Sequence, residues 1–143
     1  MVQPRQAASA YRAALRTVPP LQAVVMLYDS AMIRTAVAAD AARRGDYETQ
    51  FKEILRAAEV LNGLNMCLDT QRGGKVAKTL REMYEVVCRA MMSSVGRKTG
   101  AECCDRIVAA IRLTRDAWAE IAGVAPSRDA GSGVLAPKIA AGN

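Results

Sequence analysis

Val24-Val25-Met26-Leu27-Tyr28-Asp29-Ser30-Ala31-Met32 is the stretch around which the chain is organised. It lies shortly after the Pro19-Pro20 pair, and its apolar residues fall on more than one face of a helix. A surface helix of a globular protein normally carries a single apolar stripe of limited width. A helix that is apolar more widely must be covered on several sides, by its own bundle, by another segment or by a partner. We therefore expect the function to depend on what covers this helix.

The composition favours one all-α domain. The chain has 143 residues, of which 51% are hydrophobic but only 4% are aromatic, so Leu, Ile, Val, Met and Ala must fill the core. Such side chains suit helix-on-helix packing, and no β-branched run with period two is present. No apolar run reaches the roughly 18 residues of a membrane span. Arg5, Arg12 and Arg16 interrupt what would be the apolar core of a signal peptide. We expect a cytoplasmic protein with no membrane insertion.

The net charge of +6 raises the alternative of a nucleic-acid-binding bundle that uses Arg72, Lys75, Lys78 and Arg81. A strongly salt-dependent affinity for RNA or DNA would favour that alternative. However, acidic residues precede basic ones by four positions at several places, which is the stabilising order on a solvated helix face. These pairs are Glu48–Lys52, Glu85–Arg89 and Glu102–Arg106. The pattern favours solvated helix faces, and we expect no nucleic-acid partner.

Catalytic and metal-binding residues are not indicated. The chain has no histidine, which excludes a His-based triad and His metal ligands. Cys67, Cys88 and the Cys103-Cys104 pair lack C-x-x-C spacing, so reduced core thiols are expected rather than a zinc site. Asp29 and Asp116 lie beside bulky inward residues, where either a raised-pKa carboxylate or a polar contact at the bundle surface is conceivable. The contact is the simpler reading, and we expect no cofactor and no enzymatic activity.

Helical periodicity divides the chain into three parts. Residues 1–18 form a short amphipathic segment, which is marginal as an isolated helix and must dock or fray. Residues 19–123 hold four helices, at about 20–44, 47–68, 75–95 and from a Thr99–Glu102 capping box to about 122. Short connections predict an antiparallel up-down four-helix bundle with the first segment docked outside it. Residues 124–143 are expected to be a disordered tail.

The apolar stripes also predict which side chains face inward. The expected inward residues of the four helices, with those that widen the first stripe, are Leu21, Val24, Val25, Tyr28, Ala31, Met32, Thr35, Ala36, Ala38, Ala39, Phe51, Ile54, Leu55, Ala58, Leu61, Leu64, Leu68, Val76, Leu80, Met83, Tyr84, Val87, Met91, Val95, Cys104, Ile107, Val108, Ile111, Thr114, Trp118 and Ile121. Met26, Met32, Met83, Met91 and Met92 fit either gap-filling in this core or an adaptable binding groove, because methionine suits both.

A set of short motifs then resembles the FliS family, the cytoplasmic export chaperones of flagellin. In family order these motifs are Ala10-Tyr11-Arg12, Pro20 with Leu27-Tyr28-Asp29, Leu64-Asn65 with Leu68-Asp69, Gly73-Gly74, Leu80 with Met83-Tyr84, and Arg115-Asp116-Ala117-Trp118. The resemblance implies an antiparallel helical bundle that binds the disordered C-terminal segment of flagellin. It implies that binding prevents premature polymerisation, keeps flagellin competent for type III export and helps present it to the flagellar export apparatus. Another helical adaptor or secretion regulator that binds a partner helix is the alternative, and a homodimer stays open.

The candidate partner-binding residues combine the wide apolar helix with its neighbours. They are Tyr11, Leu15, Val18, Val25, Tyr28, Met32, Leu64, Leu68, Met83, Tyr84 and Met91. A flexible partner with amphipathic stretches would bury its apolar side chains helix-in-groove on such a surface. Residues 1–18, anchored by Tyr11, Leu15 and Val18, would cover part of it when no partner is bound.

Overall fold

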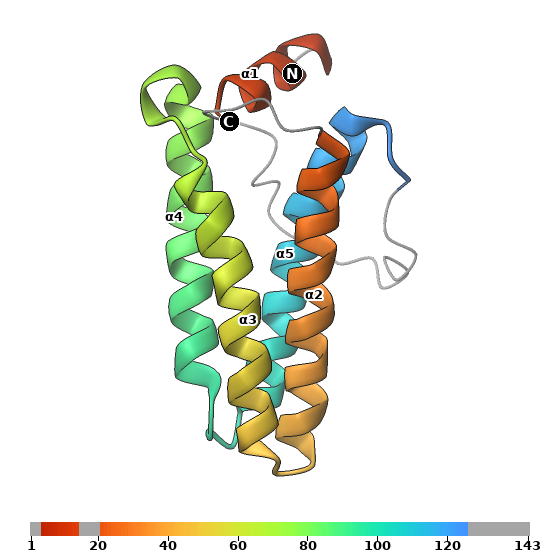
Figure 1. Cartoon of the computed structure of the whole chain (residues 1–143), viewed down its shortest axis with the longest axis vertical. Coiled ribbons are helices and arrows are strands. Elements are labelled where there is room, and N and C mark those ends of the chain that lie inside the picture. Colours follow the sequence, from red (N-terminus) through yellow and green to blue (C-terminus); the bar gives the residue numbers. More distant parts are fainter. Residues whose placement is uncertain (1–3, 15–20, 126–143) are drawn as a thin grey trace.

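The computed structural model describes residues 4–14 and 21–125 and shows a bundle of long helices with one short helix across its end (Figure 1). The helices are α1 (Pro4–Ala13), α2 (Leu21–Arg43), α3 (Tyr47–Met66), α4 (Thr70–Ser94) and α5 (Gly100–Ala122). Helices α2 to α5 run alternately up and down, joined by short turns, as the sequence predicts. The all-α bundle is therefore confirmed within the described ranges. None of these helices is long and apolar enough to cross a membrane.

Most helix ends lie where the sequence predicts them, at a glycine or at a capping residue. Gly45, Gly96 and Gly123 each have φ between 73° and 75°, a left-handed conformation that glycine adopts without steric cost. Asp46 caps α3, because its carboxylate accepts a hydrogen bond of 3.1 Å from the Thr49 amide. The Thr99 capping box is wrong: Thr99 has φ −94° and ψ 13°, outside the extended region of an N-cap, and its side chain makes no capping hydrogen bond.

Helix α4 begins earlier than the sequence predicts. Asp69 accepts hydrogen bonds from the amides of Gln71 and Arg72, at 3.1 and 2.9 Å, and so starts a helical turn where a loop is expected. Gly74 then breaks this turn from the rest of the helix, with φ 52° and ψ −127°. The expected turn at residues 71–74 is therefore one helical turn followed by a kink.

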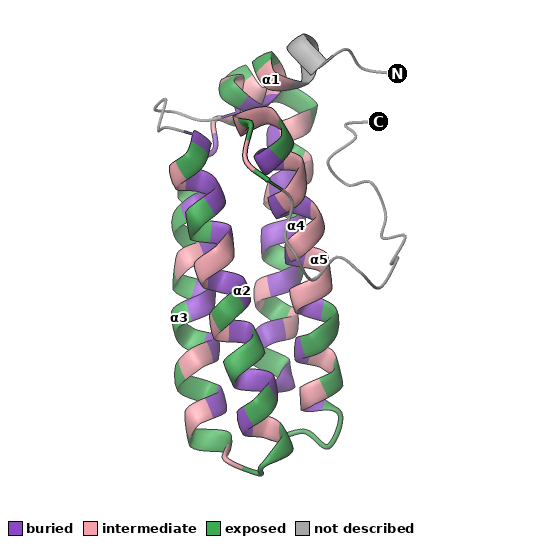
Figure 2. Cartoon of the chain, turned by 90° about the vertical axis from the view of Figure 1, so that its right-hand side faces the viewer, coloured by how far each residue is buried: buried purple, intermediate pink, exposed green. Residues whose placement is uncertain are grey.

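The core runs along the four long helices, and each of them carries buried residues at intervals along its length (Figure 2). Helix α2 packs most extensively, against α5 on one side and α3 on the other. Three predicted inward positions are wrong, since Ala36, Phe51 and Leu55 are exposed. On α3 the inward position belongs instead to Gln50, whose amide donates to the Ser94 carbonyl and accepts from the Gly96 amide. Gln50 thereby ties α3 to the α4–α5 turn.

Helix α1 closes the end of the bundle where α2 begins and α5 ends, and it packs against α4 and α5. The Tyr11 ring meets the Trp118 indole edge-on, with centroids 4.4 Å apart and an interplanar angle of 84°. After the helix, the Ala14 carbonyl accepts a hydrogen bond of 2.7 Å from the Asp69 amide. Gly73 makes the close approach possible, since a Cβ there would lie 2.5 Å from the Ala14 Cα.

Val124, which the sequence analysis assigns to the disordered tail, is ordered. Val124 packs against the core, and its amide donates to the Ala119 carbonyl at 2.8 Å. The expectation of disorder for residues 126–143 falls outside the described residues.

Candidate functional site

The outward face of α2 carries a row of side chains, apolar except for one serine, which we call the outer stripe: Met26, Ser30, Ile33 and Val37. Met26, Ile33 and Val37 are 69%, 64% and 40% exposed, while Ser30 is half-buried. Their spacing of four, three and four residues keeps them on one side of the helix, as in the seam of a coiled coil. The opposite side of α2 supplies core residues such as Val24, Tyr28 and Thr35, so α2 is apolar on both sides.

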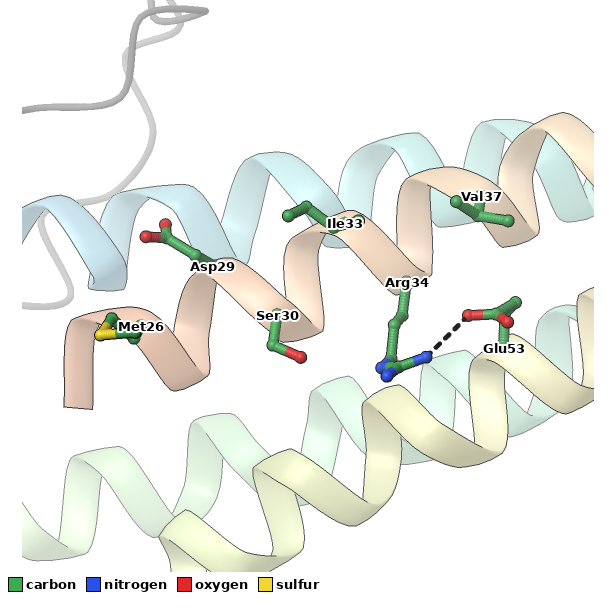
Figure 3. Close-up of a pocket in the computed structure, with 7 residues that line it drawn as sticks. All are labelled: Met26, Asp29, Ser30, Ile33, Arg34, Val37 and Glu53. Carbon is green, nitrogen blue, oxygen red and sulfur yellow. Dashed lines mark hydrogen bonds and ion pairs between the residues drawn. The ribbon is translucent and has the colours of Figure 1, made fainter. Parts of the chain in front are cut away.

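A shallow pocket of about 510 Å³ lies along this stripe on the side of α3. Figure 3 shows Ser30 and Arg34 directed toward α3, whereas Ile33 and Val37 point away from it. Arg34 and Glu53, which both line the pocket, form an ion pair of 3.3 Å that joins the two helices. A partly exposed pair of this kind contributes little to stability. The pair forms a polar edge beside the apolar row.

The other edge of the stripe is fixed by a buried arginine on α5. Arg115 donates from Nε to the Asp29 carboxylate at 2.8 Å and from Nη1 to Asp116 at 3.1 Å. The same Nη1 donates to the Ala125 carbonyl at 2.8 Å. The hydrogen bond with Asp29, and after it the one with Asp116, raise the pKa of the Arg115 guanidinium above its ordinary value. Both acids that the sequence singled out are thus polar contacts of one arginine.

A cluster of aromatic hydroxyl and indole groups lies beneath α1. Trp118 donates from Nε1 to the Tyr28 hydroxyl at 3.1 Å, and the Tyr28 and Tyr84 hydroxyls are hydrogen-bonded to each other. Burial is the main cause that raises the pKa of Tyr28 and Tyr84 well above the ordinary value, and it raises the pKa of Tyr11 to about 12. All three phenols therefore stay protonated near neutral pH. The cluster joins α1, α2, α4 and α5 at one end of the bundle.

The structure places the predicted partner-binding residues in the core rather than on the surface. Nine of them are buried: Tyr11, Val25, Tyr28, Met32, Leu64, Leu68, Met83, Tyr84 and Met91. The remaining two, Leu15 and Val18, lie outside the described residues. Tyr11 belongs to α1 and covers Trp118 at the end of the bundle, rather than the outer stripe. As the structure places them, these nine side chains offer almost no surface to a partner.

The sequence-based selection missed Ile33 and Val37, the exposed members of the outer stripe. The signal that finds them was present, since α2 is apolar on more than its core-facing side. The selection followed the buried side of that pattern and not the side that a bundle leaves uncovered. Met26 was weighed between core and groove, and its 69% exposure puts it on the surface.

The structure also shows where the cysteines lie, and where the basic residues of the nucleic-acid-binding alternative lie. Cys104 is buried, and burial raises the pKa of its thiol, while Cys67 is exposed and is therefore not the core thiol that was expected. Arg72, Lys75 and Lys78 are exposed on the first turns of α4, and Arg81 is half-buried.

Comparison with known proteins identifies a family for the chain. The family model described as "Flagellar protein FliS" matches residues 2–125. The flagellar secretion chaperone FliS of Salmonella typhimurium is 25% identical over 112 residues, which cover 76% of this chain and 80% of that protein. The flagellar secretion chaperone FliS of Vibrio cholerae is 24% identical over 107 residues, covering 75% of this chain and 78% of that protein.

Proposed function

Because the chain belongs to the family of the flagellar protein FliS, we propose that it is a cytoplasmic export chaperone of flagellin. It binds the disordered C-terminal segment of flagellin, prevents premature polymerisation and keeps the subunit competent for export. It then helps to present that cargo to the flagellar export apparatus. The relatives from Salmonella typhimurium and Vibrio cholerae are named secretion chaperones, which supports this role. The activity is binding, with no catalytic step and no cofactor.

The observation that carries this proposal is the outer stripe of α2. A helix with apolar residues on both sides is normally buried on both sides. Here the bundle covers one side, and Met26, Ile33 and Val37 stay exposed on the other. A partner that brings an amphipathic helix would bury them. The four-three-four spacing favours a partner helix that lies along α2 with apolar residues at matching intervals.

The stripe is one part of a longer contact surface. From Met26 to Val37 the helix rises by about 16 Å, which is three turns. Ordering a flexible chain costs several kcal/mol, and segments that fold on binding bury on the order of 1,000–3,000 Å² to offset it. Flagellin must therefore contact further surfaces of the bundle. The buried aromatic residues beneath α1 are the second part in this proposal, and they become accessible when α1 moves away.

The test is co-purification of this chain with flagellin that carries or lacks its C-terminal segment. The expected result is a stable complex with the intact flagellin and none with the truncated form. Equal recovery of both forms would contradict the proposal, because the binding determinant would then lie elsewhere in flagellin. Affinity that falls steeply with salt toward RNA or DNA would point instead to the basic surface of Arg72, Lys75 and Lys78.

A further inference from the structure

The outer stripe lies beside the point where the described chain ends. Asp29, which lines the pocket, and the carbonyl of Ala125 are both held by the guanidinium of Arg115, at 2.8 Å each. Ala125, after which residues 126–143 follow in the sequence, therefore lies at the α5 edge of α2, one arginine side chain away from Asp29. Ala125, the last residue that the structure describes, is thus held next to an apolar surface that the bundle leaves exposed.

The length of this segment suits the stripe. Val134, the ninth residue after Ala125, is followed by Leu135 and then by Ile139. Nine residues span at most about 30 Å when fully extended, which exceeds the roughly 16 Å between the ends of the stripe. Val134, Leu135 and Ile139 are also the large apolar side chains of residues 126–143. Chain length and composition both permit them to meet Met26 and Ile33.

We propose that residues 134–139 of this chain occupy the outer stripe of α2 when no partner is bound and leave it when a partner binds. The contact needs no helix and no packed core, so it agrees with a tail that lacks helical periodicity. A short tether gives an effective concentration in the millimolar range, so that even a weak contact is substantially occupied. A second copy of the chain is the less favoured occupant. A contact between two copies of this three-turn stripe would bury less area than the 1,200–2,000 Å² or so of a stable interface.

The first experiment needs no partner. The full-length chain with ¹³C-labelled methionine methyl groups gives separate signals for Met26, on the stripe, and Met66, which is 77% exposed on α3 and serves as the internal reference. Leu135→Asp is compared with Ser132→Asp, which adds the same charge to the same segment but removes no apolar side chain. The expected result is a shift of the Met26 signal in Leu135→Asp alone, with Met66 unchanged.

Three outcomes would overturn the proposal. One is a Met26 signal identical in the wild type and in Leu135→Asp. Another is an equal shift in both variants, because charge and not apolar contact would then explain it. The third is a wild-type Met26 signal that moves on dilution, which would assign the stripe to a second copy.

A second readout rests on the proposed function. If the segment competes with flagellin, Leu135→Asp should bind a flagellin C-terminal peptide about threefold more tightly than Ser132→Asp, because the competing contact is lost. Equal affinities of the two variants would overturn the competition. Failure of the wild type and of both variants to bind the peptide would refute the proposed function, while the Met26 comparison would still decide the occupancy of the stripe.

Discussion

At the scale of single residues, Trp118 is the side chain on which one end of the bundle depends. It is 1% exposed, donates a hydrogen bond to Tyr28 and meets the Tyr11 ring. Trp118→Ala should lower the free energy of unfolding by about 3–5 kcal/mol, because it leaves a large cavity and removes the donor. Urea unfolding followed by circular dichroism measures this change, and Trp118→Phe should cost less. A midpoint unchanged in Trp118→Ala would contradict the burial of the indole.

The buried phenols predict how stability depends on alkaline pH. The pKa of Tyr28 and of Tyr84 is raised by burial, and that of Tyr11 reaches about 12. Between the ordinary value near 10 and the folded value, the folded state keeps protons that the unfolded state releases. These groups therefore leave stability unchanged below about pH 10 and reduce it as the pH rises further. Thermal unfolding at increasing pH should show a fall that begins there, and Tyr28→Phe should make it smaller. A melting temperature that is flat up to pH 12 would contradict this.

Burial of single residues was predicted correctly where helical periodicity determines it. It was missed where a hydrogen-bond partner from a distant segment determines it. Tyr28, Tyr84 and Trp118 are inward as predicted. Gln50 and Arg115 are polar residues that the stripes did not mark as buried, because their hydrogen-bond partners come from segments far away in the chain. Only the three-dimensional arrangement supplies those partners.

At the scale of elements, the docking of α1 depends on Gly73. A Cβ at that position would lie 2.5 Å from the Ala14 Cα and 2.6 Å from the Ala77 Cβ, so Gly73→Ala must displace one of these neighbours. Overpacking of this kind costs about 1–3 kcal/mol. We expect α1 to detach more often, and the Asp69 amide, which donates to Ala14, to exchange its hydrogen about ten- to a hundredfold faster. Hydrogen exchange followed by NMR measures this directly.

Gly63→Ala is the matched control for that experiment. Gly63 lies within α3, and a Cβ there would meet nothing within 4 Å. Its replacement should stabilise the helix by about 0.5–1 kcal/mol and leave the exchange of the Asp69 amide slow. If α1 is a movable cover, Gly73→Ala should also bind a flagellin C-terminal peptide more tightly, since less docking free energy opposes the partner. Weaker binding with an intact bundle would mean that α1 contacts the partner itself.

The boundaries of the elements were largely predictable, because glycines and aspartates mark them. Gly45, Gly96 and Gly123 end segments as the sequence indicates, and Asp46 starts one. The Thr99–Glu102 motif fails although its spacing is right, because the backbone of the tight turn before α5 holds Thr99 in the wrong conformation. A sequence motif shows that a capping side chain is present, whereas the backbone conformation of the turn determines whether that side chain can form the capping hydrogen bond.

At the scale of the whole molecule, the bundle follows from four amphipathic stretches and short connections, and so the sequence predicts it. The place of α1 does not follow, because a short helix can dock wherever an apolar patch and a close backbone approach coincide. The site was only half predictable for the same reason. Periodicity shows that α2 is apolar on two sides, but only the packing of α3 and α5 against it reveals which side remains uncovered.

Because the helices of the bundle leave the stripe exposed, its contribution to binding can be separated from its contribution to folding. Ile33 is 64% exposed and carries little packing, so Ile33→Asp should change stability by about 0.5 kcal/mol or less. Near the centre of the stripe, however, it would place a charge in the partner contact. We expect the affinity for a flagellin C-terminal peptide to fall by about ten- to thirtyfold, the loss of about 1.4–2 kcal/mol that a central contact typically provides. Isothermal titration calorimetry measures it.

Val86→Asp provides the comparison that makes the result specific. Val86 is also an exposed apolar residue, at 59%, but it belongs to α4 and not to the stripe. The two substitutions introduce the same charge and remove comparable exposed apolar surface from a helix. If the peptide binds along α2, Ile33→Asp weakens it and Val86→Asp does not. If both weaken it equally, the bundle attracts the partner through its general surface, and the outer stripe loses its special place in the mechanism.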